Sequence, residues 1–133
     1  LVGLGTAIGL AYSRFETINA HLLDLKKYFI AQLRNKLPHL VCNGNSGDIE
    51  KSVNTIVSVN FPLASSNELV LFQFDLKGIM VSGGSACSSG SLKGSHVLEG
   101  LDVQGSSIRI SFGNQNTKSE IDYLINEMVS LNL

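Results

Sequence analysis

The stretch Ser107–Phe112, SIRISF, decides the fold because apolar and polar side chains alternate along it without a break. Successive side chains of a β-strand point to opposite faces of a sheet, so this pattern predicts a half-buried strand. The sheet that contains it therefore has an apolar face, with Ile108, Ile110 and Phe112, and a polar face, with Ser107, Arg109 and Ser111.

Three other stretches are also expected to be strands. Thr55–Phe61 alternates in the same way and stops at Pro62. His39–Cys42 and Ile79–Val81 are short apolar stretches, and the first of them is followed by turn-forming residues at 43–48. The sequence thus predicts four strands, which together form a small sheet.

The first part of the chain is expected to be helical. Leu1–Tyr12 has apolar residues at helical spacing among three glycines, and Phe15–Leu37 carries a strongly amphipathic stripe that ends before Pro38. Because the helical pattern is already under way at Leu1 and the chain does not begin with Met, we interpret the chain as a piece of a longer protein.

The remaining helices are marked by their end signals. Capping boxes, in which Ser or Thr is followed three residues later by Glu, predict helix starts at Ser65 and Thr117, and Ser95 can cap a short helix between them. Gly78 is suited to end the first of these helices. The last helix is expected to bury an apolar stripe of Ile121, Leu124, Ile125, Met128 and Val129.

The order of these elements predicts the fold class. Helix, strands, helix, strand, loop, helix, strand and helix follow one another, which is typical of an α+β fold with a small, largely antiparallel sheet flanked by helices on one face. The 133 residues are enough for one domain with a single core.

Charge and cysteine content narrow the function classes. The net charge is −1 and no basic patch is present, which argues against nucleic acid or a membrane as a partner. No apolar run approaches the roughly 18 residues of a bilayer span. The two cysteines make no disulfide framework, and with the three histidines they do not match zinc spacing. We therefore expect a cytoplasmic domain without a metal.

A loop of small residues holds the first candidate for chemistry. Ser82–Ser91 contains only Ser, Gly, Ala and Cys87, so it can be neither a buried strand nor a packed helix. Small neighbours leave the thiol accessible, and the surrounding backbone N–H groups can stabilise a thiolate. A flexible Gly/Ser linker that happens to contain a cysteine has the same composition. His96 could pair with Cys87, but a loop does not fix the geometry of such a pair.

Arg109 is the second candidate, because it lies on the polar face of a strand whose other face is apolar. Its planar guanidinium suits a bidentate contact with a carboxylate. An ordinary surface ion pair is the alternative interpretation of this residue.

Several motifs together resemble a known family. The stretch Gly78–Ser91, GIMVSGGSACSSGS, resembles the active-site loop of group I cysteine desulfurases, the iron–sulfur-cluster and nitrogen-fixation type, within the class V aminotransferase family. The resemblance continues through Ser95–Leu101, Ser106–Gly113 and Thr117–Met128, and upstream it includes Val2–Ala11 and Asn54–Pro62. It therefore covers nearly the whole chain.

The resemblance implies a role for each candidate. Cys87 would be the catalytic nucleophile that takes sulfur from L-cysteine as a persulfide and leaves L-alanine, and Arg109 would bind the substrate carboxylate. Residues 1–133 would be the C-terminal small domain of a homodimeric, cytoplasmic enzyme that depends on pyridoxal phosphate. Its loop would deliver sulfur to acceptor proteins such as an iron–sulfur scaffold.

Two departures limit the resemblance. Lys93-Gly94 stands where the family often has an acidic residue and proline, and no lysine here occupies the family's Schiff-base motif. We therefore expect the cofactor-binding large domain to be absent, no cofactor-binding residue in this fragment, and no activity from the fragment alone. The alternatives are the small domain of a selenocysteine lyase or aminotransferase of the same family, and a standalone, non-enzymatic sulfur carrier.

Overall fold

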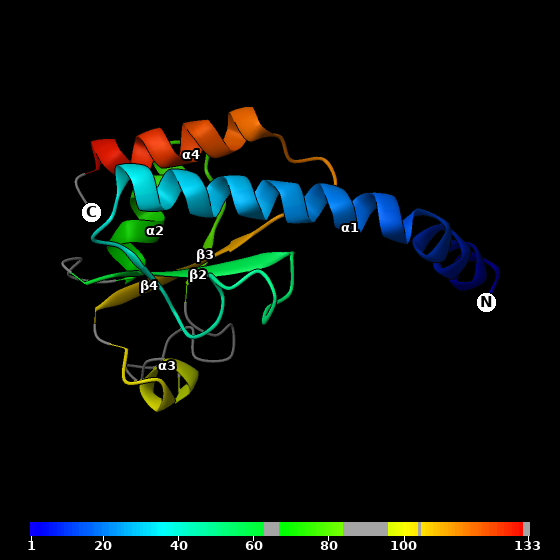
Figure 1. Cartoon of the computed structure of the whole chain (residues 1–133), viewed down its shortest axis with the longest axis horizontal. Helices are drawn as coiled ribbons and strands as arrows, with labels where there is room; N and C mark the ends of the chain where they lie inside the picture. The colour runs from blue at the N-terminus through cyan, green and yellow to red at the C-terminus, as the bar shows by residue number, and fades with distance from the viewer. Residues whose placement is uncertain (63–66, 84–95, 104, 132–133) are drawn as a thin grey trace.

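The computed structural model describes residues 1–62, 67–83, 96–103 and 105–131 (Figure 1). The fold is α+β, as the order of the sequence patterns predicts. The elements are α1 (Val2–Lys36), β1 (Val41–Cys42), β2 (Ile56–Phe61), α2 (Asn67–Leu76), β3 (Ser82–Gly83), α3 (His96–Gly100), β4 (Ser106–Ser111) and α4 (Lys118–Ser130).

The four strands form one antiparallel sheet in the order β1-β2-β4-β3. Val57 lies opposite Ile110, and Ser58 lies opposite Arg109. Because pairing partners point to the same face, this register places the apolar residues of both central strands together and leaves their polar residues on the other face. The alternation predicted from the sequence is therefore confirmed in β2 and β4.

Helices α1 and α4 cover the apolar face of the sheet, whereas α3 lies on the other side (Figure 1). The rings of Phe29 in α1 and Phe112 after β4 pack 5.7 Å apart between centroids. Helix α2 adds Val70 and Phe74 to the same core. The buried residues of α1 and α4 are Leu22, Leu25, Lys26, Phe29, Ile30, Leu33, Ile121, Leu124, Ile125 and Met128. Val129, expected in the stripe of α4, is instead 45% exposed.

The first 36 residues differ from the sequence-based expectation. Leu1–Tyr12 and the amphipathic stripe that follows belong to one continuous helix, α1. Burial begins only at Leu22, and Phe15, expected at the start of the apolar stripe, is 60% exposed. Figure 1 shows the reason, because the N-terminal part of α1 extends beyond the sheet. Within the described part of the chain, no helix is long and apolar enough to cross a membrane.

The predicted strand at Ile79–Val81 is wrong by three residues. The strand at this edge is β3, and its Ser82 and Gly83 pair with Arg109 and Ile108 of β4. The preceding residues instead connect the end of α2 to the sheet. Gly78 has φ of 71° and donates to the Asp75 carbonyl, while the Ile79 N–H donates to Phe74, which is the Schellman pattern expected of a C-terminal glycine.

The capping box of α4 is confirmed. The Thr117 Oγ1 accepts from the Glu120 N–H, and the Glu120 carboxylate accepts from the Thr117 N–H at 2.7 Å. This backbone hydrogen bond, with one from Asn116, lowers the pKa of Glu120. The predicted caps Ser65 and Ser95 lie outside the described residues.

Candidate functional site

A row of polar residues crosses the polar face of the sheet at one level. Ser58 of β2 and Ser82 of β3 lie on either side of Arg109 in β4, each directly opposite it. Asn43, one residue beyond β1, donates its backbone N–H to the Ser58 carbonyl oxygen at 2.8 Å and so extends the row to the fourth strand. The sheet register thus surrounds Arg109 with short polar side chains.

The Arg109 side chain is exposed on this polar face. The ion pairs recorded among the described residues join Lys51 to Asp48, Lys77 to Glu127 and Lys118 to Asp24, and none of them involves Arg109. The backbone carbonyl of Arg109 is 3.5 Å from the Ser82 Oγ. The geometry therefore leaves the guanidinium directed away from the core, where it can meet an anionic ligand.

Cys87 lies outside the described residues, but the strand that leads to it is described. Gly83 pairs with Ile108, next to the rung that holds Arg109. Cys87 follows Gly83 by four positions in the sequence. The sheet thus ties the beginning of the small-residue loop to the neighbourhood of Arg109. The side chain of His96 is also outside the described set.

A hydrogen-bonded cluster beside Arg109 was not predicted from the sequence. The Asn43 Nδ2 donates to the Ser58 Oγ at 2.9 Å and to the Ser107 Oγ at 3.0 Å, and the Ser107 Oγ is 3.5 Å from the Asn60 Oδ1. The alternation in β2 already indicated that Ser58 and Asn60 face away from the core. What brings Asn43 to them is the pairing of β1 with β2, which no local pattern reveals.

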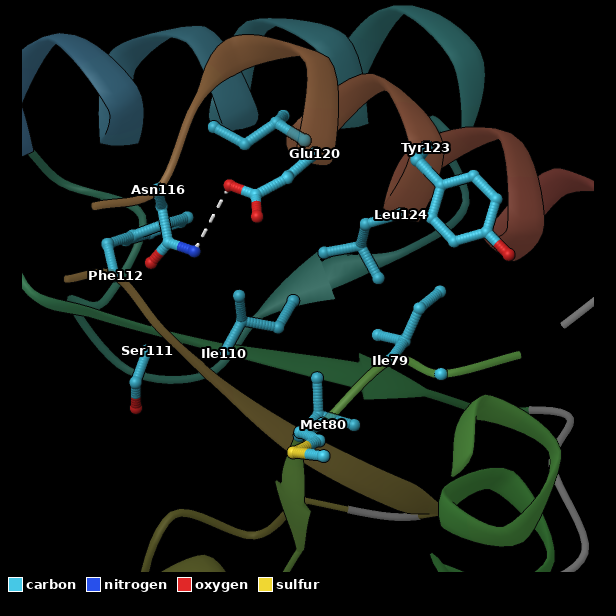
Figure 2. Close-up of a pocket in the computed structure, with 12 residues that line it drawn as sticks. Ile79, Met80, Ile110, Ser111, Phe112, Asn116, Glu120, Tyr123 and Leu124 are labelled. Atoms are coloured by element: carbon cyan, nitrogen blue, oxygen red, sulfur yellow. Dashed lines mark hydrogen bonds between the residues drawn. The ribbon is translucent and has the colours of Figure 1, made fainter. Parts of the chain in front are cut away.

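A separate cavity of about 370 Å³ lies between the edge of β4 and α4 (Figure 2). Ile79, Ile110 and Leu124 line it with other apolar side chains. Its carboxylate, Glu120, is engaged by the capping box and by the Asn116 Nδ2 at 3.3 Å. This cavity is on the helix-covered side of the sheet, so it does not belong to the face that carries Arg109.

The buried lysine of the described residues does not fit the amine of a pyridoxal phosphate site. Such a site needs an amine that can bond covalently to the cofactor, and the buried lysine of the domain, Lys26, is fully engaged elsewhere. Its Nζ donates to the Ser52 Oγ and the Val53 carbonyl at 2.7 Å and to the Ile56 carbonyl at 3.2 Å. No cluster of three potential metal ligands occurs among the described residues either.

The second cysteine, Cys42, is half-buried and packs against the core. Burial raises the pKa of its thiol, an effect that Arg34 and Lys26 only partly offset. A Cβ added at Gly47 would come within 2.9 Å of the Cys42 Sγ, so the turn that follows β1 closes tightly over the sulfur. Cys42 therefore has the environment of a structural cysteine.

Comparison with known proteins gives a consistent assignment. The family model "Aminotransferase class-V" matches residues 1–124. Cysteine desulfurase IscS of Pseudoalteromonas translucida is 37% identical over 132 residues, which are 96% of this chain and 31% of that protein. The protein of the same name from Dictyoglomus turgidum is 34% identical over 94% of this chain and 32% of its own length.

Solved structures show the same fold. A NifS-like protein from Rickettsia africae superposes with a TM-score of 0.79 at 24% identity, over 98% of this chain and 33% of that chain. The apo structure of a cysteine desulfurase from Thermococcus onnurineus gives a TM-score of 0.65 at 23% identity, over 83% of this chain and 24% of that chain. The present chain thus spans about a third of the length of the curated relatives that it matches.

Proposed function

Because the chain belongs to the class V aminotransferase family, we propose that residues 1–133 are the C-terminal small domain of a pyridoxal phosphate-dependent cysteine desulfurase. The names and the lengths of its relatives support this proposal, since a third of each relative corresponds to this chain. The exposed apolar residues in the N-terminal part of α1, among them Leu4, Ile8 and Phe15, support it further. Such a surface suits contact with another domain of the same protein.

In this proposal Cys87 and Arg109 have different roles in the reaction. Arg109 holds the α-carboxylate of L-cysteine, and the Cys87 thiolate accepts its sulfur, so that L-cysteine and the Cys87 thiol become L-alanine and a Cys87 persulfide. The observation that carries this division is the pairing of Ser82 with Arg109, because it starts the Cys87 loop at the rung of the sheet that presents the guanidinium. A thiol on a small-residue loop can then reach the substrate and carry sulfur away.

The cofactor belongs to the rest of the protein. Pyridoxal phosphate supplies an electron sink that labilises bonds at the substrate. Lys26, the buried lysine of this chain, is engaged by Ser52, Val53 and Ile56, so we assign the lysine and the phosphate contacts to the large domain. Homodimer formation, delivery to acceptor proteins such as an iron–sulfur scaffold, and a cytoplasmic location are part of the same proposal.

The test uses the full-length protein that contains this chain, with pyridoxal phosphate bound. Cys87→Ser should still bind L-cysteine, seen as a change in the cofactor absorbance, but should release no L-alanine. Cys42→Ser is the matched control and should keep alanine release near the level of the unsubstituted protein. Full alanine release by Cys87→Ser would refute Cys87 as the sulfur acceptor, and amino transfer to a 2-oxo acid without sulfur release would assign an aminotransferase instead.

A further inference from the structure

We propose that Ser58 is a second contact for the carboxylate that Arg109 holds, and that Asn43 orients the Ser58 hydroxyl for this contact. The inference rests on the proposed function, because it takes the ligand to be an α-amino acid with a free carboxylate. It adds one binding residue and one positioning residue to the polar face of the sheet.

The register brings Ser58 and Arg109 together at close range. The Phe112 N–H donates to the Thr55 carbonyl oxygen at 2.8 Å, so these two residues, which flank β4 and β2, form a hydrogen-bonded pair. Along the two strands, every second pair of opposite residues after this one is therefore also hydrogen-bonded. Ser58 and Arg109 fall between two such pairs, where opposite Cα atoms approach to about 4.5 Å and side chains are nearest. The Ser58 hydroxyl therefore lies beside the base of the Arg109 side chain.

Asn43 fixes the Ser58 hydroxyl from the other side. Its Nδ2 donates to the Ser58 Oγ at 2.9 Å and to the Ser107 Oγ at 3.0 Å. Asn43 is only 8% exposed, and its own backbone is bonded to Ser58, so the amide cannot swing out to solvent. The amide thereby occupies one lone pair of the Ser58 oxygen in a set direction.

This arrangement leaves the hydroxyl proton of Ser58 to be donated. Within the part of the chain that the structure describes, no acceptor for it is recorded. Arg109 cannot serve, because a guanidinium carries only donors. A carboxylate bound by Arg109 supplies the missing acceptor. A hydrogen bond from a hydroxyl to an ionised carboxylate is stronger than a hydrogen bond from a hydroxyl to a neutral acceptor.

The neighbour on the other side of Arg109 does not offer the same contact. Ser82 also lies directly opposite Arg109, but its Oγ is directed at the Arg109 backbone carbonyl, 3.5 Å away. Ser58 is thus the hydroxyl of this row that an amide orients and whose proton remains available for a ligand on the polar face.

The experiment compares two ligands that differ only at the carboxylate. L-Alanine and L-alaninamide are titrated calorimetrically into the full-length holoenzyme and its variants. Ser58→Ala should weaken L-alanine binding about tenfold, the cost of one hydrogen bond to a charged acceptor, and leave L-alaninamide binding unchanged. Ser58→Thr keeps the hydroxyl and should retain most of the affinity. Ser111→Ala, on the same face of β4, is the matched control and should change neither ligand.

The positioning role of Asn43 has its own readout. Asn43→Ala should weaken L-alanine binding in the background with Ser58 but add nothing to Ser58→Ala, because both changes remove the same contact. An equal loss for L-alanine and L-alaninamide in Ser58→Ala would overturn the proposal in favour of a structural role, and so would unchanged L-alanine binding. Arg109→Lys distinguishes the role of Ser58 from that of the carboxylate site as a whole. If Arg109→Lys weakens L-alanine binding and Ser58→Ala does not, only the role of Ser58 is refuted. If Arg109→Lys has no effect on L-alanine binding, the proposed carboxylate site is refuted as well.

Discussion

Arg109 of β4 lies directly opposite Ser82 of β3, and Ser82 is five residues before Cys87 in the chain. The pairing of β3 with β4 fixes the position of Ser82 and Gly83 relative to Arg109. In the proposed enzyme, one rung of the sheet therefore holds the substrate and also anchors the loop that carries the sulfur.

Exchanging Arg109 for Lys in the full-length protein should lower kcat/KM for L-cysteine by about 30- to 1000-fold, mostly through a higher KM. The guanidinium can make two parallel hydrogen bonds to a carboxylate, but an ammonium makes only a point contact. Steady-state alanine release measures the effect. Arg34→Lys, an exposed arginine on α1, should behave like the unsubstituted protein. An unchanged KM in Arg109→Lys would assign Arg109 to an ordinary surface role.

The two cysteines should react at very different rates with an alkylating reagent. Burial raises the pKa of Cys42, so at neutral pH this thiol holds less thiolate than an ordinary one and is also less accessible. Peptide mapping after brief labelling at pH 7 should find Cys87 modified first. Because the pKa of Cys42 is raised, its labelling rate should continue to increase with pH beyond the range in which an ordinary thiol reaches its plateau. Equal rates at neutral pH would contradict the accessibility of Cys87.

The 133-residue chain on its own should fold but retain no pyridoxal phosphate after dialysis, and it should release no alanine from L-cysteine. The reason is that the buried lysine, Lys26, is held by Ser52, Val53 and Ile56 and cannot bond to the cofactor. Absorbance spectroscopy after dialysis decides the point. A retained band of bound cofactor would show that the chain carries a cofactor site of its own.

Replacing the buried Lys26 by Met should destabilise the domain by about 3 kcal/mol. Its ammonium is fully buried and bonds one hydroxyl and two carbonyl groups, all of which would lose a charged donor. Urea unfolding of the isolated chain, followed by circular dichroism, measures the change. Lys27→Met alters the neighbouring, exposed lysine and should have little effect. Equal stability of the two variants would mean that the hydrogen bonds of Lys26 contribute nothing net.

Burial also lowers the pKa of Lys26 below its usual value of 10.5. The unfolded chain then binds a proton at this site more tightly than the folded chain does. Between the lowered pKa and 10.5, this group should therefore make the folded state more stable as the pH rises. The difference in stability between the unsubstituted chain and Lys26→Met, measured from pH 7 to 10, should grow with pH, and a constant difference would contradict the shift.

Local sequence patterns were sufficient to predict the structure wherever contacts within a few residues decide it. The alternation in β2 and β4 identified the apolar face of the sheet, and the Thr117 capping box identified the start of α4, because both are contacts within a few residues. The position of β3 was wrong by three residues. Ile79–Val81 has the composition of a strand, but hydrogen-bond partners on β4 begin at Ser82, and pairing is a property of two strands rather than one.

The sequence by itself determined which residues of β2 and β4 face the core, where α4 begins and that Arg109 points away from the apolar side. Only the tertiary structure decided which polar residues meet Arg109. Asn43, Ser58 and Ser82 are separated from it by 66, 51 and 27 positions along the chain, yet the register of four antiparallel strands brings them into one row. The physical reason is that side-chain periodicity is local, whereas register is set by the joint burial of two strands against the same helices.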